Sequence, residues 1–305
     1  ALDAEASAKI YAAKGRPSDN PLIVHIADWE AIRAIVSEIP EAAKQLADAF
    51  WPGPLTMILN KSDLVPYATT GGLKTVAVRM PVNPIARALI RAGGGYVAAP
   101  SANTSGRPSP TKAEHVAEDL NGKIDMIIDG GTVDIGLEST IVDLTDGAPT
   151  ILRPGYINQE MLTKVLGEVE MDRGLIAPES GVHPKAPGMK YRHYAPKADL
   201  IIVEGEAEKV RRKINELVQQ QISEGKKVGV IGTDESLSYY KDGDVRSIGS
   251  RKDEITIAQH LFGLLREFDE SDISVIYSEA FETPQIGQAI MNRLIKAAGH
   301  QIIQV

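Results

Sequence analysis

Cysteine is absent from the 305 residues, and this excludes disulfide bonds, thiolate nucleophiles and cysteine-based metal sites. The sequence holds only six histidines and contains neither a Cys/His cluster nor an HExxH sequence, so we expect no protein-bound zinc and no dedicated metal site. A chain without cysteine is compatible with a reducing compartment, and we predict a cytoplasmic protein.

Long hydrophobic runs and an excess of positive charge are also missing. No apolar stretch reaches the length of a membrane-spanning helix, so we expect no membrane partner. The formal net charge is -8, so any contact with RNA would require a local basic patch. The length is sufficient for two domains of ordinary size. The sequence begins inside a helix predicted over residues 1–14, and we expect a strand and a loop upstream of it.

A polar loop over residues 99–111 separates a predicted buried strand from a helix predicted over residues 112–120. The loop is rich in hydroxyl side chains and prolines, and it also contains Asn103 and Arg107. Such a loop offers hydroxyls, amides and a helix N-terminus to an anion. The alternative is an ordinary polar connection built from turn residues.

Four further residues in the first half carry candidate chemistry. Lys14 and Arg16 follow the first helix, where they either clamp phosphate oxygens or complement the helix dipole. Arg79 interrupts an apolar strand, and a buried arginine requires a carboxylate from the protein or from a ligand. His25 lies in a short strand, as a structural residue or as a ligand.

The second half changes in character. Residues 181–197 form a basic stretch without acidic residues, and we predict that it lies on an acidic surface or on a nucleotide. Beyond it, strands and helices alternate, which predicts a parallel sheet, without a GxGxxG or Walker sequence. We expect Arg266 and Arg293 on solvated helix faces, with contact to the other domain as the alternative. We also predict a strand over residues 124–129.

Taken in order, several motifs resemble those of the YrdC/Sua5 family, the threonylcarbamoyl-AMP synthases. They are Lys14-Gly-Arg-Pro, Trp51-Pro-Gly-Pro-Leu-Thr, Val78-Arg-Met-Pro, Pro100-Ser-Ala-Asn-x-Ser-Gly, Glu138-Ser-Thr-Ile-Val-Asp143, Pro187-Gly-Met-Lys-Tyr-Arg-His-Tyr-Ala-Pro196 and Gly287-Gln-Ala-Ile-Met-Asn-Arg-Leu294. The resemblance covers essentially the whole chain and matches the two-domain Sua5 form. The family's Pro-Thr-Glu-Thr-x-Tyr-Gly-Leu loop, which helps to bind threonine, is the segment expected upstream.

The resemblance implies an α/β fold in two parts. We expect a YrdC-like catalytic domain over residues 1–180, with a twisted mixed sheet and helices. Residues 181–197 would be a basic linker that closes over the nucleotide as a lid. Residues 198–305 would form a smaller, Rossmann-like domain with a parallel sheet.

The resemblance also implies the reaction. The family joins L-threonine, bicarbonate and ATP into threonylcarbamoyl-AMP and pyrophosphate, for the t6A modification beside the anticodon of tRNA. The expected cofactor is Mg²⁺ on the phosphates of ATP, and the expected partners include downstream t6A-transfer proteins and tRNA. The chemistry needs charge neutralisation and exclusion of water rather than a protein nucleophile.

By the same resemblance, roles pass to individual residues of this sequence. The KxR…SxN set is Lys14, Arg16, Ser101 and Asn103, and it would carry the catalytic contacts. The ATP side would comprise Arg16, Asn20, Thr75, Ser101, Asn103, Ser109, Arg153 and Tyr194. Threonine would be held by His25, Arg79, Ala99 and Ser139, with Arg79 pairing the substrate carboxylate.

Two alternatives remain open at this stage. The chain could be a binding module for double-stranded RNA or tRNA without its own catalysis, and salt-dependent tRNA binding would support that interpretation. It could also be a relative that makes a carbamoyl-adenylate from carbamoyl phosphate, as YrdC-like modules do inside hydrogenase maturation proteins. Those proteins carry zinc-finger segments, which need cysteines that this chain lacks.

Overall fold

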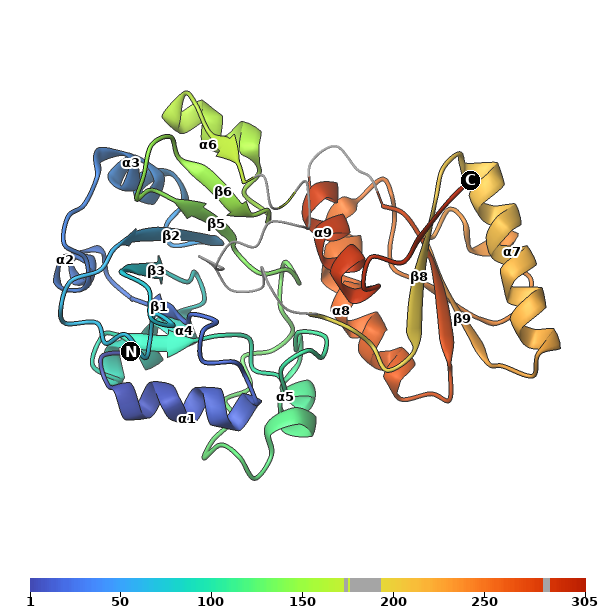
Figure 1. Cartoon of the computed structure of the whole chain (residues 1–305), viewed down its shortest axis with the longest axis horizontal. Coiled ribbons are helices and arrows are strands. Elements are labelled where there is room, and N and C mark those ends of the chain that lie inside the picture. The colour runs from blue at the N-terminus through green and yellow to red at the C-terminus, as the bar shows by residue number, and fades with distance from the viewer. Residues whose placement is uncertain (173–174, 176–192, 282–285) are drawn as a thin grey trace. The chain divides into compact units, whose positions relative to one another are not determined.

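The computed structural model describes residues 1–172, 175, 193–281 and 286–305, and the chain divides into two compact units (Figure 1). The N-terminal unit comprises Ala1–Ser105, Val116–Gly130 and Glu138–Tyr191. The C-terminal unit comprises Gly106–His115, Gly131–Leu137 and Arg192–Val305. Two segments from the first half of the chain therefore belong to the C-terminal unit. Residues 181–192 of the predicted linker lie outside the described residues.

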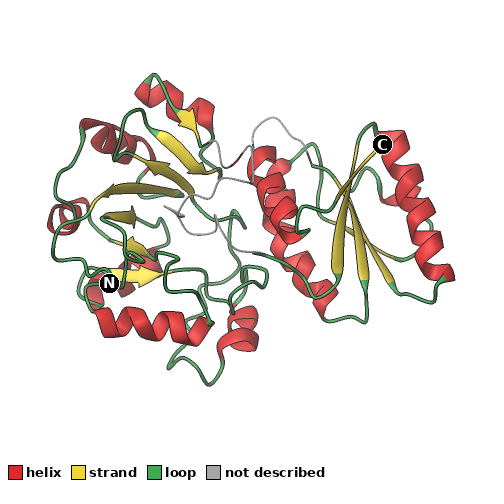
Figure 2. Cartoon of the chain, viewed as in Figure 1, coloured by secondary structure: helices red, strands yellow, loops and turns green. Residues whose placement is uncertain are grey.

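A mixed sheet forms the centre of the N-terminal unit (Figure 2). Its strand order is β4-β1-β3-β2-β5-β6-β7, and antiparallel and parallel neighbours alternate across it. This arrangement confirms the predicted mixed sheet. The strands are β1 (Ile23–His25), β2 (Leu55–Asn60), β3 (Thr75–Arg79), β4 (Val97–Ala99), β5 (Thr140–Asp143), β6 (Thr150–Arg153) and β7 (Glu170–Met171).

The helices of this unit begin and end at recognisable signals. In α1 (Ala4–Lys14) the Asp3 carboxylate caps the first turn, and Gly15 ends the helix in the left-handed conformation with φ 61°. Pro40 separates the short helices before it from α3. The remaining elements are η1 (Trp29–Ala31), α2 (Ile32–Ile35), α3 (Glu41–Phe50), α4 (Pro84–Ala92), α5 (Ala113–Leu120) and α6 (Gln159–Leu166). The first residues of α5 belong to the C-terminal unit.

The two faces of the mixed sheet carry separate apolar clusters, because successive side chains of a strand point to opposite faces. The larger cluster includes Met57, Val78 and Val142 and extends to α3 and α6. The smaller cluster, on the opposite face, consists of Ile23, Ile58, Ala77, Ile141 and Leu152. This second face also carries the polar residues described below.

The C-terminal unit is built on a purely parallel sheet with the order β10-β9-β11-β8-β12. This confirms the predicted parallel α/β arrangement. The strands are β8 (Asp199–Glu204), β9 (Val228–Gly232), β10 (Asp244–Ser247), β11 (Val275–Glu279) and β12 (Ile302–Gln304). The helices are α7 (Ala207–Ser223), α8 (Glu254–Asp269) and α9 (Gly287–Ala297), with a short η3 (Leu237–Tyr239).

The strand predicted over residues 124–129 is wrong. This segment pairs with no strand of the described sheets, and it exposes Met126, Ile127 and Ile128. An apolar, β-branched run favours a strand only where a neighbouring strand and a buried face receive it. Among the described residues, no helix combines the length and the apolar character needed to cross a membrane.

Candidate active site

A row of polar side chains crosses the mixed sheet at one level. Strand pairing aligns His25 with Arg79, Arg79 with Thr56, Thr56 with Ile141, and Ile141 with Arg153. Residues directly opposite one another on paired strands lie on the same face. This row therefore lies on the face of the smaller apolar cluster, two positions along from Ile23, Ala77 and Ile58. The strands bring together side chains that are more than 120 residues apart in the sequence.

Arg79 is the central cation of this row. Its Nε donates to the carbonyl of Gly53 at 3.2 Å, and within the described part of the chain no carboxylate forms an ion pair with it. Burial, and secondarily the charge of Arg153, lower the pKa of Arg79 to about 10. A cation in these surroundings is stabilised by an anion.

His25 is held as a neutral neighbour of Arg79. Burial, and secondarily the positive charge of Arg79, lower the pKa of His25 to about 4. Its Nδ1 donates to the carbonyl of Ile23 at 3.1 Å. At neutral pH this imidazole is therefore a fixed polar group and not a second cation.

Ser139 connects the row to the strand beside it. Its hydroxyl lies 2.7 Å from the hydroxyl of Thr56 and accepts from Nη2 of Arg153 at 3.1 Å. Nε of Arg153 donates to the backbone carbonyl of Ser139 at 3.0 Å. Arg153 and Ser139 are thus coupled, although the resemblance assigned them to ATP and to threonine respectively. Ala99 pairs with Ile23, which lies two residues before His25 on β1, so Ala99 is not part of the row.

Lys14 forms a second cluster with the polar loop. Lys14 is the last residue of α1, directly before Gly15, and it is only 4% exposed. Its Nζ donates to the carbonyls of Ser101 and Asn103, each at 2.5 Å, and to Oδ1 of Asn103 at 3.2 Å. Ser101 therefore contributes its backbone to this contact.

The charge balance around Lys14 is unusual. Burial, and secondarily the charge of Arg16, lower the pKa of Lys14 to about 7, while Asp119 raises it. Asp119 accepts the backbone N–H of Thr104 at 3.0 Å and so supports the same loop. Near neutral pH this ammonium gains or loses its proton readily, and a bound phosphate would favour the charged form.

Arg16 and Asn20 occupy the turn after α1. Arg16 donates through Nε to the carbonyl of Asn20 at 3.1 Å and through Nη2 to that of Pro21 at 3.0 Å. The side-chain amide of Asn20 is buried at 2% exposure, and neither its nitrogen nor its oxygen has a hydrogen-bond partner in the described structure. An unsatisfied buried amide is unfavourable, so this group is a good candidate for contact with a ligand.

The other predicted ATP residues do not share these surroundings. Thr75 begins β3, at the opposite end of the strand from Arg79. Ser109 and Tyr194 belong to the C-terminal unit. The structure thus groups Lys14 with the 101–103 loop, and His25 with Arg79, Ser139 and Arg153.

Sequence reasoning missed three contributors: Gly53, Thr56 and Asp119. Gly53 supplies the acceptor for Arg79, and Thr56 bonds to Ser139. Both lie in the Trp51-Pro-Gly-Pro-Leu-Thr motif. The register between the two predicted strands would have placed Thr56 beside Arg79. Asp119 had no such signal, since it resembles any acidic residue of an exposed helix.

Among the residues that the structure describes, no group of three or more His, Asp and Glu side chains is arranged to hold a metal ion.

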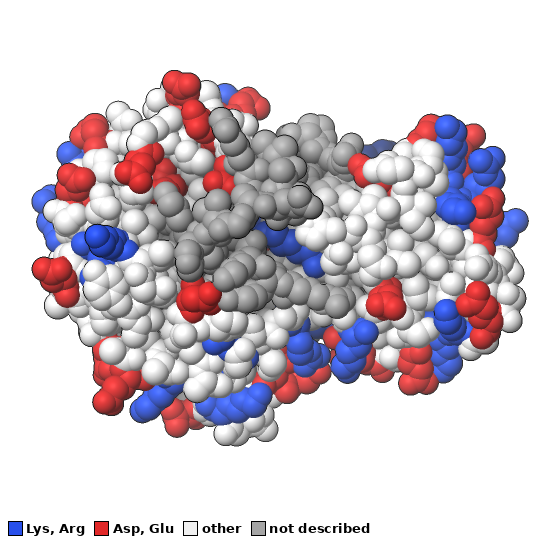
Figure 3. Space-filling model, in the orientation of Figure 1, with Lys and Arg blue, Asp and Glu red and all other residues white. Residues whose placement is uncertain are grey.

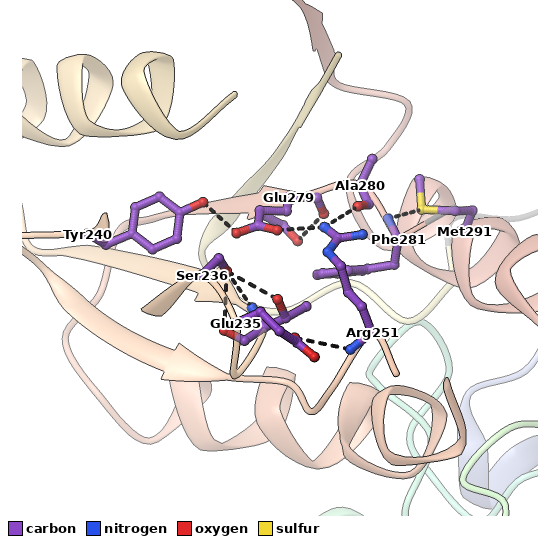
Figure 4. Close-up of polar contacts among 10 residues, drawn as sticks. Glu235, Ser236, Tyr240, Arg251, Glu279, Ala280, Phe281 and Met291 are labelled. Atoms are coloured by element: carbon purple, nitrogen blue, oxygen red, sulfur yellow. Dashed lines mark hydrogen bonds and ion pairs between the residues drawn. The ribbon is translucent and has the colours of Figure 1, made fainter. Parts of the chain in front are cut away.

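The C-terminal unit contains a polar network of a different kind, which Figure 4 shows. The Glu279 carboxylate at the end of β11 accepts from the Tyr240 hydroxyl at 2.6 Å and from Nη2 of Arg251 at 2.5 Å. Arg251 also donates to the carbonyl of Ala280 at 2.9 Å. Here the protein itself supplies an anion for the cation.

The face drawn in Figure 3 does not single out a nucleic-acid interface among the described residues. On the face shown in Figure 3, Lys and Arg side chains are interspersed with Asp and Glu side chains. Exposed ion pairs among the described residues include Lys44–Glu41, Arg91–Asp28 and Lys227–Asp272. This view therefore offers no continuous basic stripe among the described residues.

Comparisons with known proteins agree with the motifs. A family model for Sua5, YciO and YrdC, described as telomere recombination, matches residues 1–155, and a model described as the C-terminal domain of threonylcarbamoyl-AMP synthase matches residues 157–299. The threonylcarbamoyl-AMP synthase of Pyrococcus abyssi is 53% identical over all of this chain and 88% of the relative. That of Bacillus subtilis is 48% identical over all of this chain and 86% of the relative.

A solved structure supports the same assignment for the whole fold. The crystal structure of Pyrococcus abyssi Sua5 complexed with L-threonine superimposes with a TM-score of 0.94 at 52% identity. The match covers 100% of this chain and 88% of that one. Together with the family models and the curated relatives, this places the chain in the Sua5/YrdC family of threonylcarbamoyl-AMP synthases, which are nucleotidyltransferase enzymes.

Proposed function

We propose that this protein makes threonylcarbamoyl-AMP and pyrophosphate from L-threonine, bicarbonate and ATP. The observation that carries the proposal is Arg79, a partly buried cation without an ion-paired carboxylate among the described residues, aligned between His25 and Thr56. The relatives named threonylcarbamoyl-AMP synthase and the Sua5 complex with L-threonine support it.

The reaction has two steps. The amine of threonine combines with bicarbonate to give a carbamate and water. A carbamate oxygen then attacks the α-phosphorus of ATP, the bond to the bridging oxygen breaks, and pyrophosphate leaves with its electron pair. The enzyme must therefore orient two anions, offset their charge and exclude water from a labile carbamate.

On the threonine side, Arg79 would pair with the substrate carboxylate through the guanidinium nitrogens not bonded to Gly53. The neutral His25 adds a polar edge without a second charge. Ser139, held by Thr56 and Arg153, would contact the polar groups of the amino acid, and Ala99 would line the pocket.

On the nucleotide side, Lys14 and Arg16 would offset phosphate charge, and the unsatisfied amide of Asn20 would gain its hydrogen bonds from ATP. The remaining residues proposed to shape this side are Thr75, Ser101, Asn103, Ser109, Arg153 and Tyr194. Mg²⁺ would enter with the phosphates of ATP. The product would then serve t6A formation on tRNA in the cytoplasm through downstream transfer proteins.

Pyrophosphate release tests the proposal. With Mg²⁺ and ATP present, release should require both threonine and bicarbonate, and Arg79→Ala should abolish it at threonine concentrations that saturate the wild type. Release that needs neither co-substrate would contradict carbamate adenylation. No release, combined with salt-dependent binding of tRNA, would instead favour the RNA-binding module.

A further inference from the structure

One face of helix α8 holds three separate segments of the C-terminal unit. The contacts come from Gln259, Phe262, Arg266 and Asp269, whose spacing of three and four residues places them on the same side of the helix. The three segments are residues 106–111, 134–136 and 193–197. All of them belong to the same unit as α8, although two come from the first half of the chain.

Arg266 is the central residue of this face. It is 1% exposed, and its Nε and Nη2 donate to the carbonyl of Pro108 at 3.1 and 2.7 Å. The expectation of solvated helix faces for Arg266 and Arg293 is therefore wrong, since Arg293 is fully buried as well. The positive charge of an arginine favours exposure to water. Here two guanidinium nitrogens donate to the same carbonyl, and these hydrogen bonds compensate part of the cost of burial.

The contact with Pro108 fixes the position of the next residue, Ser109. Proline limits the backbone torsions of the segment, so anchoring its carbonyl constrains where Ser109 lies. Ser109 is itself buried at 6% exposure. Thr111, at the end of the same segment, lies against Gly263 of α8, where a side-chain carbon would sit 3.7 Å from the threonine hydroxyl.

The same helix face fixes the segment that carries Tyr194. The centroids of the Tyr194 and Phe262 rings lie 5.0 Å apart. The backbone of Tyr194 is in the left-handed region, with φ 66°. Asp269 accepts the backbone N–H of Lys197 at 2.6 Å. The N–H of Ala195 donates to the carbonyl of Gly106 at 3.0 Å and joins the two segments directly.

A second ionic contact supports the first segment. Nη2 of Arg107 lies 3.6 Å from Oδ2 of Asp269, and Nζ of Lys197 donates to the carbonyl of Asp269 at 3.0 Å. Gln259 donates to the carbonyl of Asp134 and so holds the third segment. A non-glycine residue with positive φ persists only where its surroundings enforce it, as these contacts do for Tyr194.

We propose that helix α8, through Arg266 and Asp269, positions Ser109 and Tyr194 for nucleotide binding. Arg266 and Asp269 are positioning residues that act through the 106–111 and 193–197 segments. The inference rests on the proposed function, in which Ser109 and Tyr194 contact ATP. It gives the C-terminal unit a role in ATP affinity, whereas threonine is bound by side chains of the N-terminal unit.

The test compares Mg·ATP and L-threonine binding, by calorimetry, in wild type, Arg266→Lys, Arg266→Ala and Asp269→Asn. Arg266→Ala should weaken ATP binding at least tenfold and leave threonine affinity within twofold. Arg266→Lys keeps the positive charge but loses the two parallel guanidinium donors, so its ATP affinity should lie between those of wild type and Arg266→Ala. Hydrogen exchange should rise at the amides of residues 106–111.

Ile214→Ala is the matched control, because Ile214 is fully buried on α7 in the core of the same unit. It should lower the melting temperature of the protein without changing ATP affinity. Equal weakening of ATP binding in Ile214→Ala and Arg266→Ala would overturn the proposal, since general loosening of the unit would then explain the effect. Unchanged ATP affinity in a folded Arg266→Ala or Asp269→Asn protein would also overturn it.

Two further variants separate this inference from the proposed function. Ser109→Ala and Tyr194→Ala should each weaken ATP binding while threonine affinity stays unchanged. If neither does so and the wild type still releases pyrophosphate with threonine and bicarbonate, the role of α8 is refuted and the reaction stands. If the wild type binds ATP through these residues but releases no pyrophosphate, the reaction is refuted and the role of α8 stands.

Discussion

Two polar regions of this protein surround an arginine in opposite ways. In the C-terminal unit, Arg251 pairs with Glu279, which also accepts from Tyr240 (Figure 4). In the N-terminal unit, Arg79 bonds only to the carbonyl of Gly53, and no described carboxylate pairs with it. The first region is closed within the protein, whereas the second has positive charge in excess.

The difference separates structural polar groups from binding groups. A cation paired with a buried carboxylate joins chain segments, and removal of the cation leaves the buried charge uncompensated. A partly buried cation held only by a neutral acceptor keeps a lowered pKa and gains most from an incoming anion. The presence of an arginine alone would not distinguish these two roles, but its partners do.

The largest expected effect is on threonine binding. Arg79→Ala should reduce affinity for L-threonine by about 3–5 kcal/mol, which corresponds to more than a hundredfold, because the substrate carboxylate loses its cation. The melting temperature should stay the same or rise, since the variant removes an uncompensated buried charge. Calorimetry and thermal unfolding measure both, and a large loss of stability with unchanged affinity would mean that Arg79 is structural.

Glu279→Gln should have the opposite profile. We expect unfolding free energy to fall by about 2 kcal/mol, because Arg251 loses its anion and Tyr240 a charged acceptor. Affinity for L-threonine should not change. Denaturant unfolding gives the free energy, and the double variant Glu279→Gln/Arg251→Met should recover part of the loss. Full additivity of the two substitutions would show that the pair is not coupled.

The lowered pKa of Lys14 predicts that ATP binding depends on pH. Because its pKa in the folded protein is about 7, its charge is lost as the pH rises, and ATP affinity should fall by up to about tenfold per pH unit above that value. Lys14→Met should bind ATP weakly with a flat profile between pH 7.5 and 9. A wild-type profile that is equally flat would contradict the role of Lys14.

The lowered pKa of Lys14 also makes the folding stability depend on pH. Its folded pKa lies below the ordinary value of 10.5, so between about pH 7 and 10.5 the unfolded state binds more protons. The contribution of Lys14 to stability therefore increases as the pH rises through this window, and it is least favourable below pH 7. Comparing the pH dependence of unfolding in wild type and Lys14→Met isolates this contribution.

The smallest expected effect concerns His25. Removal of the neighbouring charge in Arg79→Ala should raise the pKa of His25 from about 4, but burial, the larger cause, should keep it below 6.5. Titration of the imidazole by NMR measures the change, and Arg87→Ala is a control that removes a different arginine. An unchanged pKa in Arg79→Ala would show that the two side chains do not interact as described.

The sequence predicted the two sheet types and drew attention to the residues of the candidate site, because local patterns carry both signals. Short apolar runs indicated the strands, Gly15 marked the end of the helix that carries Lys14, and Arg79 was conspicuous in an apolar strand. What it did not provide was the partners across the fold. Thr56 lies beside Arg79 through strand register, and Arg266 reaches Pro108 across 158 residues of sequence.

The failure at residues 124–129 has the same origin. An apolar run has the propensity of a strand, but only the completed sheet decides whether a neighbour is available for it. Likewise, the charge of Arg266 predicted exposure, and only the folded chain shows the carbonyl that receives it. Long-range contacts are thus the part of this site that local sequence patterns leave undetermined.

The most direct test of the central claim follows the carbon of bicarbonate into the product. The protein is incubated with L-threonine, Mg·ATP and ¹³C-labelled bicarbonate, and the products are analysed by mass spectrometry. The account predicts threonylcarbamoyl-AMP that carries one labelled carbon and whose formation is lost in Arg79→Ala. Formation of AMP and pyrophosphate without a labelled adduct, or a labelled adduct undiminished in Arg79→Ala, would contradict it.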